Sequence, residues 1–242
     1  MPNWCENHIT IEGDYGTLSN MDFIMKSSEW ESEADDAPEM GQPMLLVPMP
    51  EALRGTRAPA PTGDYDPEGR LQALVDDPAN EHWTPEHYEA DKAEHYALIE
   101  RAERAKAETG YADWYSWANN EWGTKWSMDV YGYTYDVDRD PEAIHISGNT
   151  AWAPPTALLE KISQKFGVKV SLTYFEGGMD FIGASVIIDG ATYDSSGSFS
   201  DHLPEDFDWD NDDAWEIQDD LRDRLIDHHE RIAAMEAGLA TV

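Results

Sequence analysis

The order of the strand and helix patterns along the chain constrains its fold more than any other feature of the sequence. Residues 7–12 (NHITIE) alternate polar and apolar side chains and end at Gly13, which is typical of a half-buried strand. Residues 17–26 carry an apolar stripe at helical spacing, and Thr17 or Ser19 is the expected helix cap. The first two predicted elements are therefore a strand and a helix.

The second half of the chain extends this pattern. The turn sequence DRDPE separates two strand-like segments that are expected to pair as a hairpin, and Asp189-Gly190 marks the turn of a further hairpin. A helix with an apolar stripe is predicted over 156–166, and Gly167 is expected to end it. Strands are predicted at 126–132, 143–149 and 168–175.

Residues from about 27 to 122 interrupt this order and are interpreted as a helical insertion. Their clearest helix covers 84–108, with Thr84 as its cap. Without the insertion the order is βαββαβ followed by an extra hairpin. This order predicts an α+β fold, a ferredoxin-like antiparallel sheet with both core helices on one face. The insertion helices and their tryptophans are expected to cover the other face.

Residues 203–242 differ in character from residues 1–202, which are assigned to the ferredoxin-like domain. They begin as an acidic loop and become an amphipathic helix. Like charges repel, so folding alone gives little reason to keep so many carboxylates together. The candidate partner-binding residues are the clustered aspartates of this segment: Asp206, Asp208, Asp210, Asp212, Asp213, Asp219, Asp220 and Asp223.

The charge of the whole chain narrows the class of partner. The 242 residues include 50 Asp and Glu against 16 Lys and Arg, which gives a formal net charge of −34. Such a field repels nucleic acid and anionic membranes and attracts basic protein surfaces. Direct nucleic-acid binding is therefore not expected. An acidic surface also serves solubility and salt adaptation, which remains the simpler explanation of the composition.

Candidate ligand-binding residues gather in and after the segment WANNEWGTKW (117–126). Its rings could stack on a base or a sugar while Lys, Asn and Thr side chains hold polar groups. The alternative is structural, because tryptophans bury large areas in a core. On that interpretation Trp122 and Trp126 are mostly buried. The candidates are Trp117, Asn119, Asn120, Trp122, Thr124, Lys125, Trp126, Asn149 and Trp152.

No catalytic or metal-binding constellation emerges from the sequence. Cys5 is the single cysteine, and on a strand its side chain and that of His8 point to opposite faces, which argues against a thiol–imidazole pair. The acidic run from Asp208 resembles a calcium loop, but Asp213 stands where that loop requires Gly. We therefore expect no enzyme activity, no metal and no cofactor.

Several motifs occur in a fixed order along the chain: MPNWCENHITIEG, LVPMPEAL, NNEWGTKWSMDV, GNTAWAPP and YFEGGMDFIG. In these the chain resembles the YubB-type family of phage and plasmid proteins, which is described as carrying a ferredoxin-like domain. The resemblance runs to about Gly183, is weak in 29–43 and 55–113, and is absent from the acidic tail. It implies a mobile-element origin and the ferredoxin-like fold, and it supplies no catalytic residue.

Together these features predict a non-enzymatic accessory protein of a phage or related element. It is expected to bind a basic surface on a host protein in the host cytoplasm, as a nucleic-acid mimic or an anti-defence inhibitor. The alternative is a small-ligand or nucleotide-sequestering protein that uses the Trp-rich segment. No membrane association is expected, because the longest apolar stretch, MLLVPMP, is too short to span a bilayer.

Overall fold

The computed structural model describes residues 3–27, 42–61, 67–77, 84–203 and 217–226. The chain divides into two compact units. One unit contains residues 1–48 and 120–242 and carries the sheet, and the other contains residues 49–119 and is helical. The second unit falls inside the range predicted as an insertion.

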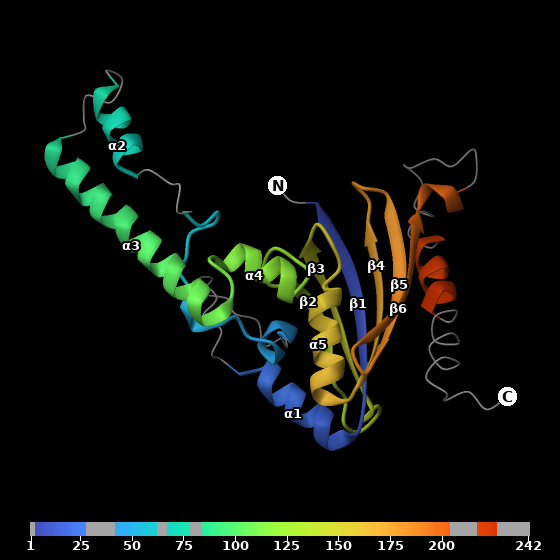
Figure 1. The fold of residues 1–242 in the computed structure, drawn as a ribbon. Helices are drawn as coiled ribbons and strands as arrows, with labels where there is room; N and C mark the ends of the chain where they lie inside the picture. The colour runs from blue at the N-terminus through green and yellow to red at the C-terminus, as the bar shows by residue number, and fades with distance from the viewer. Residues whose placement is uncertain (1–2, 28–41, 62–66, 78–83, 204–216, 227–242) are drawn as a thin grey trace. The chain divides into compact units, whose positions relative to one another are not determined.

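The first unit is built on one six-stranded antiparallel sheet with the order β2-β3-β1-β4-β5-β6 (Figure 1). Its first four positions, β2-β3-β1-β4, are those of the ferredoxin-like βαββαβ arrangement, so the predicted fold class is confirmed. The last two strands extend the sheet beyond β4. The strands are β1 (Trp4–Glu12), β2 (Asp129–Thr134), β3 (Ala143–Ala151), β4 (Lys169–Glu176), β5 (Phe181–Ile188) and β6 (Ala191–Ser198).

The residues of the turn explain why the extra hairpin, β5 and β6, forms. Asp189 and Gly190 connect β5 to β6 and have φ angles of 52° and 78°. Two consecutive positive φ angles make the turn twist with the strands, and Asp-Gly is a preferred pair for it. The predicted hairpin at Asp189-Gly190 is therefore confirmed.

The two faces of the sheet differ in chemistry because successive side chains of a strand point to opposite sides. In β1, Asn7, Ile9 and Ile11 are fully buried, whereas Glu6 and His8 are partly exposed. We call the first side the helix face and the second the opposite face.

Helices α1 (Tyr15–Met25) and α5 (Thr156–Phe166) both lie on the helix face, as predicted (Figure 1). The Tyr133 hydroxyl of β2 donates to Asp22 of α1 over 2.5 Å, and the Thr192 hydroxyl of β6 donates to Glu160 of α5 over 2.6 Å. The expected cap of α1 was wrong. Asp14 caps the helix by accepting from two backbone N–H groups, so the helix begins earlier than predicted.

The prediction that the insertion tryptophans cover the opposite face is wrong for Trp122. Its indole Nε1 donates to the Val47 carbonyl over 2.8 Å, and its own carbonyl accepts from the N–H of Leu158 in the first turns of α5. Val47 follows the short helix η1 (Pro43–Leu46), which packs on α1. Trp122 therefore belongs to the side of the sheet that carries the helices.

The opposite face is contacted by the helical residues 217–226 near the C-terminus. Leu221 shares a buried cluster with Ile182 of β5 and Phe199 after β6, and Ile217 and Leu225 pack against that cluster. Because these apolar residues recur at intervals of four, they form one stripe on the helix. The observed part of the acidic tail is thus attached to the sheet.

The helical unit contains η2 (Glu51–Leu53), α2 (Pro67–Asp76), α3 (Pro85–Thr109) and most of α4 (Trp114–Glu121). Thr84 caps α3 and Gly110 ends it in a left-handed conformation, as predicted. Helix α2 was missed, because the Pro- and Gly-rich residues before and at its start favoured a loop; Pro67 is compatible with a first turn.

No helix within the described ranges is both long and apolar enough to cross a membrane.

Candidate functional site

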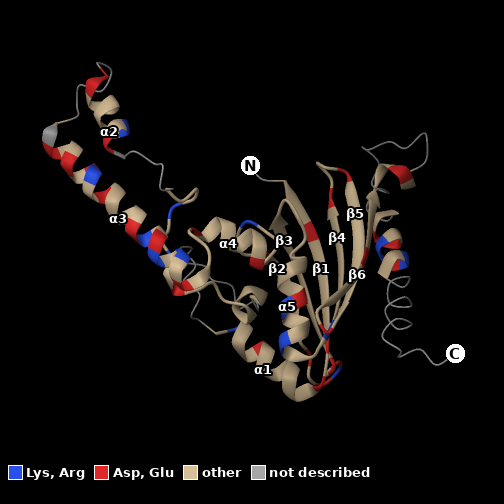
Figure 2. Cartoon of the chain, viewed as in Figure 1, with Lys and Arg blue, Asp and Glu red and all other residues tan. Residues whose placement is uncertain are grey.

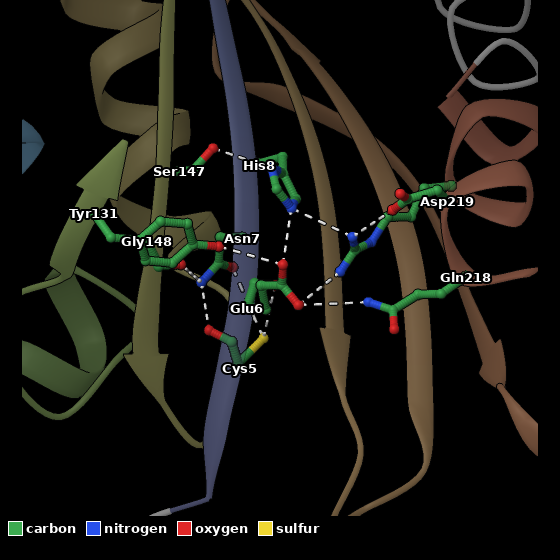
Figure 3. Close-up of polar contacts among 10 residues, drawn as sticks. Cys5, Glu6, Asn7, His8, Tyr131, Ser147, Gly148, Gln218 and Asp219 are labelled. Atoms are coloured by element: carbon green, nitrogen blue, oxygen red, sulfur yellow. Dashed lines mark hydrogen bonds and ion pairs between the residues drawn. The ribbon is translucent and has the colours of Figure 1, made fainter. Parts of the chain in front are cut away.

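A cluster of polar side chains occupies the opposite face beneath residues 217–226 (Figure 3). Strand β1 supplies two members, β2 and β3 supply one each, and the C-terminal helical segment supplies the rest. We call it the Glu6 cluster; its members are Glu6, His8, Tyr131, Ser147, Gln218, Asp219 and Arg222.

Arg222 is the centre of this cluster. It is 5% exposed, and its Nη2 lies 3.1 Å from Glu6 Oε2 while its Nη1 lies 3.2 Å from Asp219 Oδ1. Its buried Nε has no hydrogen-bond partner among the described residues. A buried guanidinium is stable only when carboxylates compensate its desolvation, so Arg222 ties the C-terminal segment to β1.

Glu6 is held in its charged form. The hydrogen bond from His8 and the charge and hydrogen bonds of Arg222 lower the pKa of Glu6 from 4.5 to about 2, against the opposing effect of burial. The same carboxylate accepts a hydrogen bond from Tyr131, and burial together with Glu6 raises the pKa of that phenol to about 12. The cluster is therefore built around a permanent negative charge on Glu6.

Ser147, His8 and Glu6 follow one another as in a hydrolase triad, with 3.0 Å between His8 Nδ1 and Ser147 Oγ and 3.0 Å between His8 Nε2 and Glu6 Oε1. Arg222 Nη1, which can only donate, lies 3.3 Å from the same Nε2. Because the ionised Glu6 carboxylate can only accept, the proton of His8 is placed on Nε2, and Nδ1 accepts from the Ser147 hydroxyl. Arg222 and Gln218 of the C-terminal segment contact the Glu6 end of this row, so the row also serves to attach that segment to the sheet.

Cys5 lies on the helix face, away from His8. Burial and the charge of Glu176 raise the pKa of the Cys5 thiol to about 12, so the thiolate that a nucleophile requires is not populated. The neighbouring Asn7 amide donates to the Cys5 carbonyl over 2.7 Å and to Thr150 Oγ1 over 2.9 Å. This part of β1 has a packing role.

The predicted ligand residues of the Trp-rich segment fall into two groups. Trp117 and Trp122 are buried, at 5% and 1% exposure, and Thr124 is buried with its hydroxyl bonded to the backbone of Ala151. Asn119 and Asn120 are exposed on α4. The buried members are used in packing and present no side chain to a ligand.

Lys125 and Trp126, at the end of the segment, are partly exposed and lie against each other. Trp126 is partly exposed, which corrects the expectation that it is mostly buried; its ring lies edge-on to the Trp4 ring at 6.1 Å. Lys125 Nζ lies 4.6 Å from the centre of the Trp126 ring, within cation–π distance. The expected cost of Trp126→Ala is accordingly below that of a fully buried tryptophan.

Trp152 and Asn149 complete the predicted set at the end of β3. Trp152 is 51% exposed and has a φ of 74°, which is unfavourable for a residue with a side chain. Its N–H donates to the Asn3 carbonyl over 3.0 Å. Asn149 is partly exposed and pairs with Glu6 in the register of β3 and β1.

Trp4 and Met179 were missed from the sequence. Trp4 is 45% exposed and faces Ala151 in the β1–β3 register, next to Trp152; Met179 is 67% exposed in the β4–β5 turn. The Glu176 carboxylate fixes that turn by accepting from the N–H groups of Gly178 and Met179. The end of β3 and the β4–β5 turn both lie beside Asn3, which precedes β1, so four apolar residues gather at this end of the sheet. We call them the aromatic end: Trp4, Trp126, Trp152 and Met179.

The predicted partner-binding aspartates are only partly described. Asp206, Asp208, Asp210, Asp212 and Asp213 lie outside the described residues. Asp219, Asp220 and Asp223 are exposed on the helical segment, as expected of solvated acids. Asp219 pairs with Arg222 and Asp220 pairs with Arg224, so two of them also carry intrahelical ion pairs.

The described residues hold no group of three or more His, Cys, Asp or Glu side chains arranged to bind a metal ion.

Replacing Glu6 by Gln should remove part of the acid sensitivity of folding. Because the pKa of Glu6 is lowered from 4.5 to about 2, its ion pairs stabilise the fold above pH 4.5 and lose that effect as the pH falls toward 2. We expect the free energy of unfolding of Glu6→Gln to change less steeply than wild type across this window in urea titrations. Glu12→Gln is the control, since Glu12 shares the strand and face and pairs with Lys169. Equal slopes for wild type and Glu6→Gln would contradict the assignment.

Known proteins were compared with the chain as solved structures, as curated proteins and as family models. A solved structure, protein Api92 from Yersinia pseudotuberculosis, matches with 12% identity and a TM-score of 0.41, covering 82% of this chain and 98% of that chain. No curated protein matches the chain. A family model described as "Ferredoxin-like domain in Api92-like protein" matches residues 130–218. Residues 130–218 are thus similar to the ferredoxin-like domain found in Api92-like proteins.

Proposed function

We propose that this protein is a non-enzymatic accessory protein of a phage or related mobile element that binds a basic surface on a host protein. The mobile-element part rests on the sequence resemblance to the YubB-type family. Binding would act in the host cytoplasm, by occupying a surface that normally contacts nucleic acid or by inhibiting a defence protein. The observation that carries the binding function is the exposed aromatic end on a chain of net charge −34.

The aromatic end has the composition of a binding hot spot. Exposed tryptophans are costly in water, and Trp is enriched among residues that dominate protein–protein affinity. Trp4 and Trp152 are each about half exposed, and Trp152 is held outward by a backbone conformation that costs free energy. Strain at such a position is characteristic of functional rather than packing residues.

Charge complementarity supports a partner with a basic surface. Acidic residues are distributed over both units (Figure 2), so a basic protein is attracted from a distance. Exposed Trp rings also bind guanidinium and ammonium groups by cation–π contacts, worth about 0.5–1 kcal/mol each at exposed sites. A partner surface rich in Arg and Lys fits both features.

The binding test is a pull-down from host lysate followed by affinity measurement with the captured protein after purification. Trp4→Ala/Trp152→Ala should weaken binding at least tenfold, because it removes both exposed rings. The matched control, Tyr15→Ala/Phe23→Ala, removes two exposed rings from helix α1 of the same unit, at 56% and 75% exposure, and should bind like wild type.

Two further arms test the role of charge. Neutralising Asp206, Asp208, Asp210 and Asp212 as Asn should weaken binding, and association should slow steeply with salt as the Debye length falls from ~30 Å at 0.01 M to ~3 Å at 1 M. Capture of a protein that has no basic surface would exclude the proposed binding. The proposal would also be excluded if the tryptophan variants, the aspartate variants and added salt all left the affinity unchanged.

The second candidate function is capture of a small aromatic ligand, such as a nucleotide, at the same end. Its specific support is Lys125 stacked against the partly exposed Trp126 ring beside Trp4. Nucleotide titration monitored by tryptophan fluorescence tests it, with Lys125→Ala as the variant. Saturable quenching that Lys125→Ala removes would favour this function over protein binding; no quenching by any nucleotide would exclude it.

A further inference from the structure

The helical unit contains a cavity of about 370 Å³ between α2, α3 and the segment 57–61. This volume lies within the range of about 300–1,000 Å³ typical of small-molecule sites. Arg70 lines it from α2, His95 and Leu98 from α3, and Arg57 from the segment, together with Pro59 and Pro61.

The lining is unusual for this chain. The protein has 50 carboxylates and only 16 Lys and Arg, yet the described lining includes Arg57 and Arg70 and no Asp or Glu. An anion bound in the cavity would lie beside both Arg57 and Arg70, and guanidinium groups bind oxyanions by charge-assisted hydrogen bonds. The remaining surface is apolar, from Pro59, Pro61 and Leu98.

The walls of the cavity are fixed by hydrogen bonds within the helical unit. The Asp113 carboxylate is buried and accepts from the Ala60 N–H over 3.3 Å and from the Ser116 N–H over 2.7 Å. The Thr56 hydroxyl, also buried, accepts from the Trp114 N–H over 2.9 Å. These contacts hold the segment 57–61 against the start of α4.

The two helices are also joined to each other. Glu68 of α2 pairs with Lys92 of α3 over 3.0 Å and accepts from the Tyr96 hydroxyl over 3.1 Å. His95 Nδ1 donates to the Asp91 carbonyl over 2.8 Å, which orients the ring. The cavity is therefore largely preformed, and a ligand does not have to order its walls.

We propose that this cavity binds a small organic anion that has an apolar body. Its carboxylate, sulfonate or phosphate group lies between Arg57 and Arg70, and its apolar part lies against Pro59, Pro61 and Leu98. The site belongs to residues 49–119 and is independent of the aromatic end and of the proposed protein partner.

The test compares two fluorescent probes that differ only in charge. 8-Anilinonaphthalene-1-sulfonate carries a sulfonate, and N-phenyl-1-naphthylamine is its neutral counterpart. We expect the full chain to bind the sulfonate with a dissociation constant at least tenfold lower than that of the neutral probe. This comparison uses wild-type protein alone. Failure of the sulfonate to bind, or equal affinity for both probes, would overturn the proposal.

Variants then locate the site. Arg57→Gln/Arg70→Gln should reduce sulfonate affinity at least tenfold and leave the neutral probe unaffected. Arg54→Gln/Arg104→Gln is the control, because it makes the same charge change at exposed residues outside the cavity lining. Leu98→Trp should fill the apolar part and weaken both probes. An equal loss in the control pair, or full sulfonate binding by Leu98→Trp, places the probe elsewhere and overturns the proposal. If the double Gln variant does not fold, Leu98→Trp decides the location.

Discussion

Trp122→Ala should destabilise the protein by about 3–5 kcal/mol, the range for replacing a buried tryptophan. The ring is 1% exposed and is the largest of the fully buried side chains among the described residues. The variant also removes the donor to the partly buried Val47 carbonyl, which adds the cost of that lost hydrogen bond. Urea unfolding monitored by circular dichroism measures the change.

Trp152→Ala is the matched control for this experiment. It deletes the same side chain at a position that is 51% exposed, and we expect a loss below about 1 kcal/mol. Trp122→Phe retains a buried aromatic ring but removes the hydrogen bond to Val47 and part of the ring volume, so its loss should be smaller than that of Trp122→Ala. A loss of less than about 1 kcal/mol for Trp122→Ala would contradict the packing of Trp122 between η1 and α5.

Arg222→Ala should release the helical residues 217–226 from the sheet and cost about 2–3 kcal/mol. Removing one partner of a buried ion pair costs about 3–5 kcal/mol, and the expected value is lower because the Glu6 and Asp219 side chains are 35% and 59% exposed. Amide hydrogen exchange should speed up in 217–226 while β1 and β4 stay protected, and denaturant unfolding should report the loss of stability.

Arg224→Ala is the matched control on the same helical segment. Arg224 is 65% exposed and pairs with Asp220, so its loss should cost at most about 0.5 kcal/mol and leave exchange unchanged. Arg222→Met retains the apolar stem of the side chain and isolates the effect of the charge. Similar exchange rates in Arg222→Ala and Arg224→Ala would show that the apolar stripe alone attaches the segment.

The attachment gives a physical account of the acidic tail that charge alone does not provide. Leu221 and Arg222 face the sheet, whereas Asp219, Asp220 and Asp223 face solvent on the same helical turns. A helix that is apolar on one side and acidic on the other can be fixed to its own domain and still present carboxylates to a partner. Release of the segment by Arg222→Ala would expose the apolar cluster of Ile182 and Phe199.

Elements with a strong local signal were predictable from the sequence. Strand β1 has strict alternation, α3 has Thr84 and Gly110 at its ends, and Asp189-Gly190 has the preferred chemistry of a hairpin turn. Helix α2 was not predictable in the same way, because Pro67 and Gly69 lower its intrinsic preference for helix.

The composition of the candidate sites could not be predicted from local sequence patterns. WANNEWGTKW contains three tryptophans, yet Trp122 is buried and Trp126 is partly exposed. The aromatic end joins Trp4, Trp152 and Met179 from three separate segments, and the Glu6 cluster joins β1 to Arg222 across most of the chain. No local pattern connects residues so far apart.

The sequence by itself determined the order of the elements, the ferredoxin-like class and the large excess of negative charge, since periodicity, turn chemistry and composition are local properties. Only the tertiary structure decided which face the C-terminal helical segment covers, which tryptophans reach solvent and which side chains meet Arg222. The physical reason is that burial, ion pairing and cavity formation depend on which distant side chains meet. Strand register determines which residues become neighbours. It places Glu6 opposite Asn149 and Phe175, and it places Trp4 opposite Ala151.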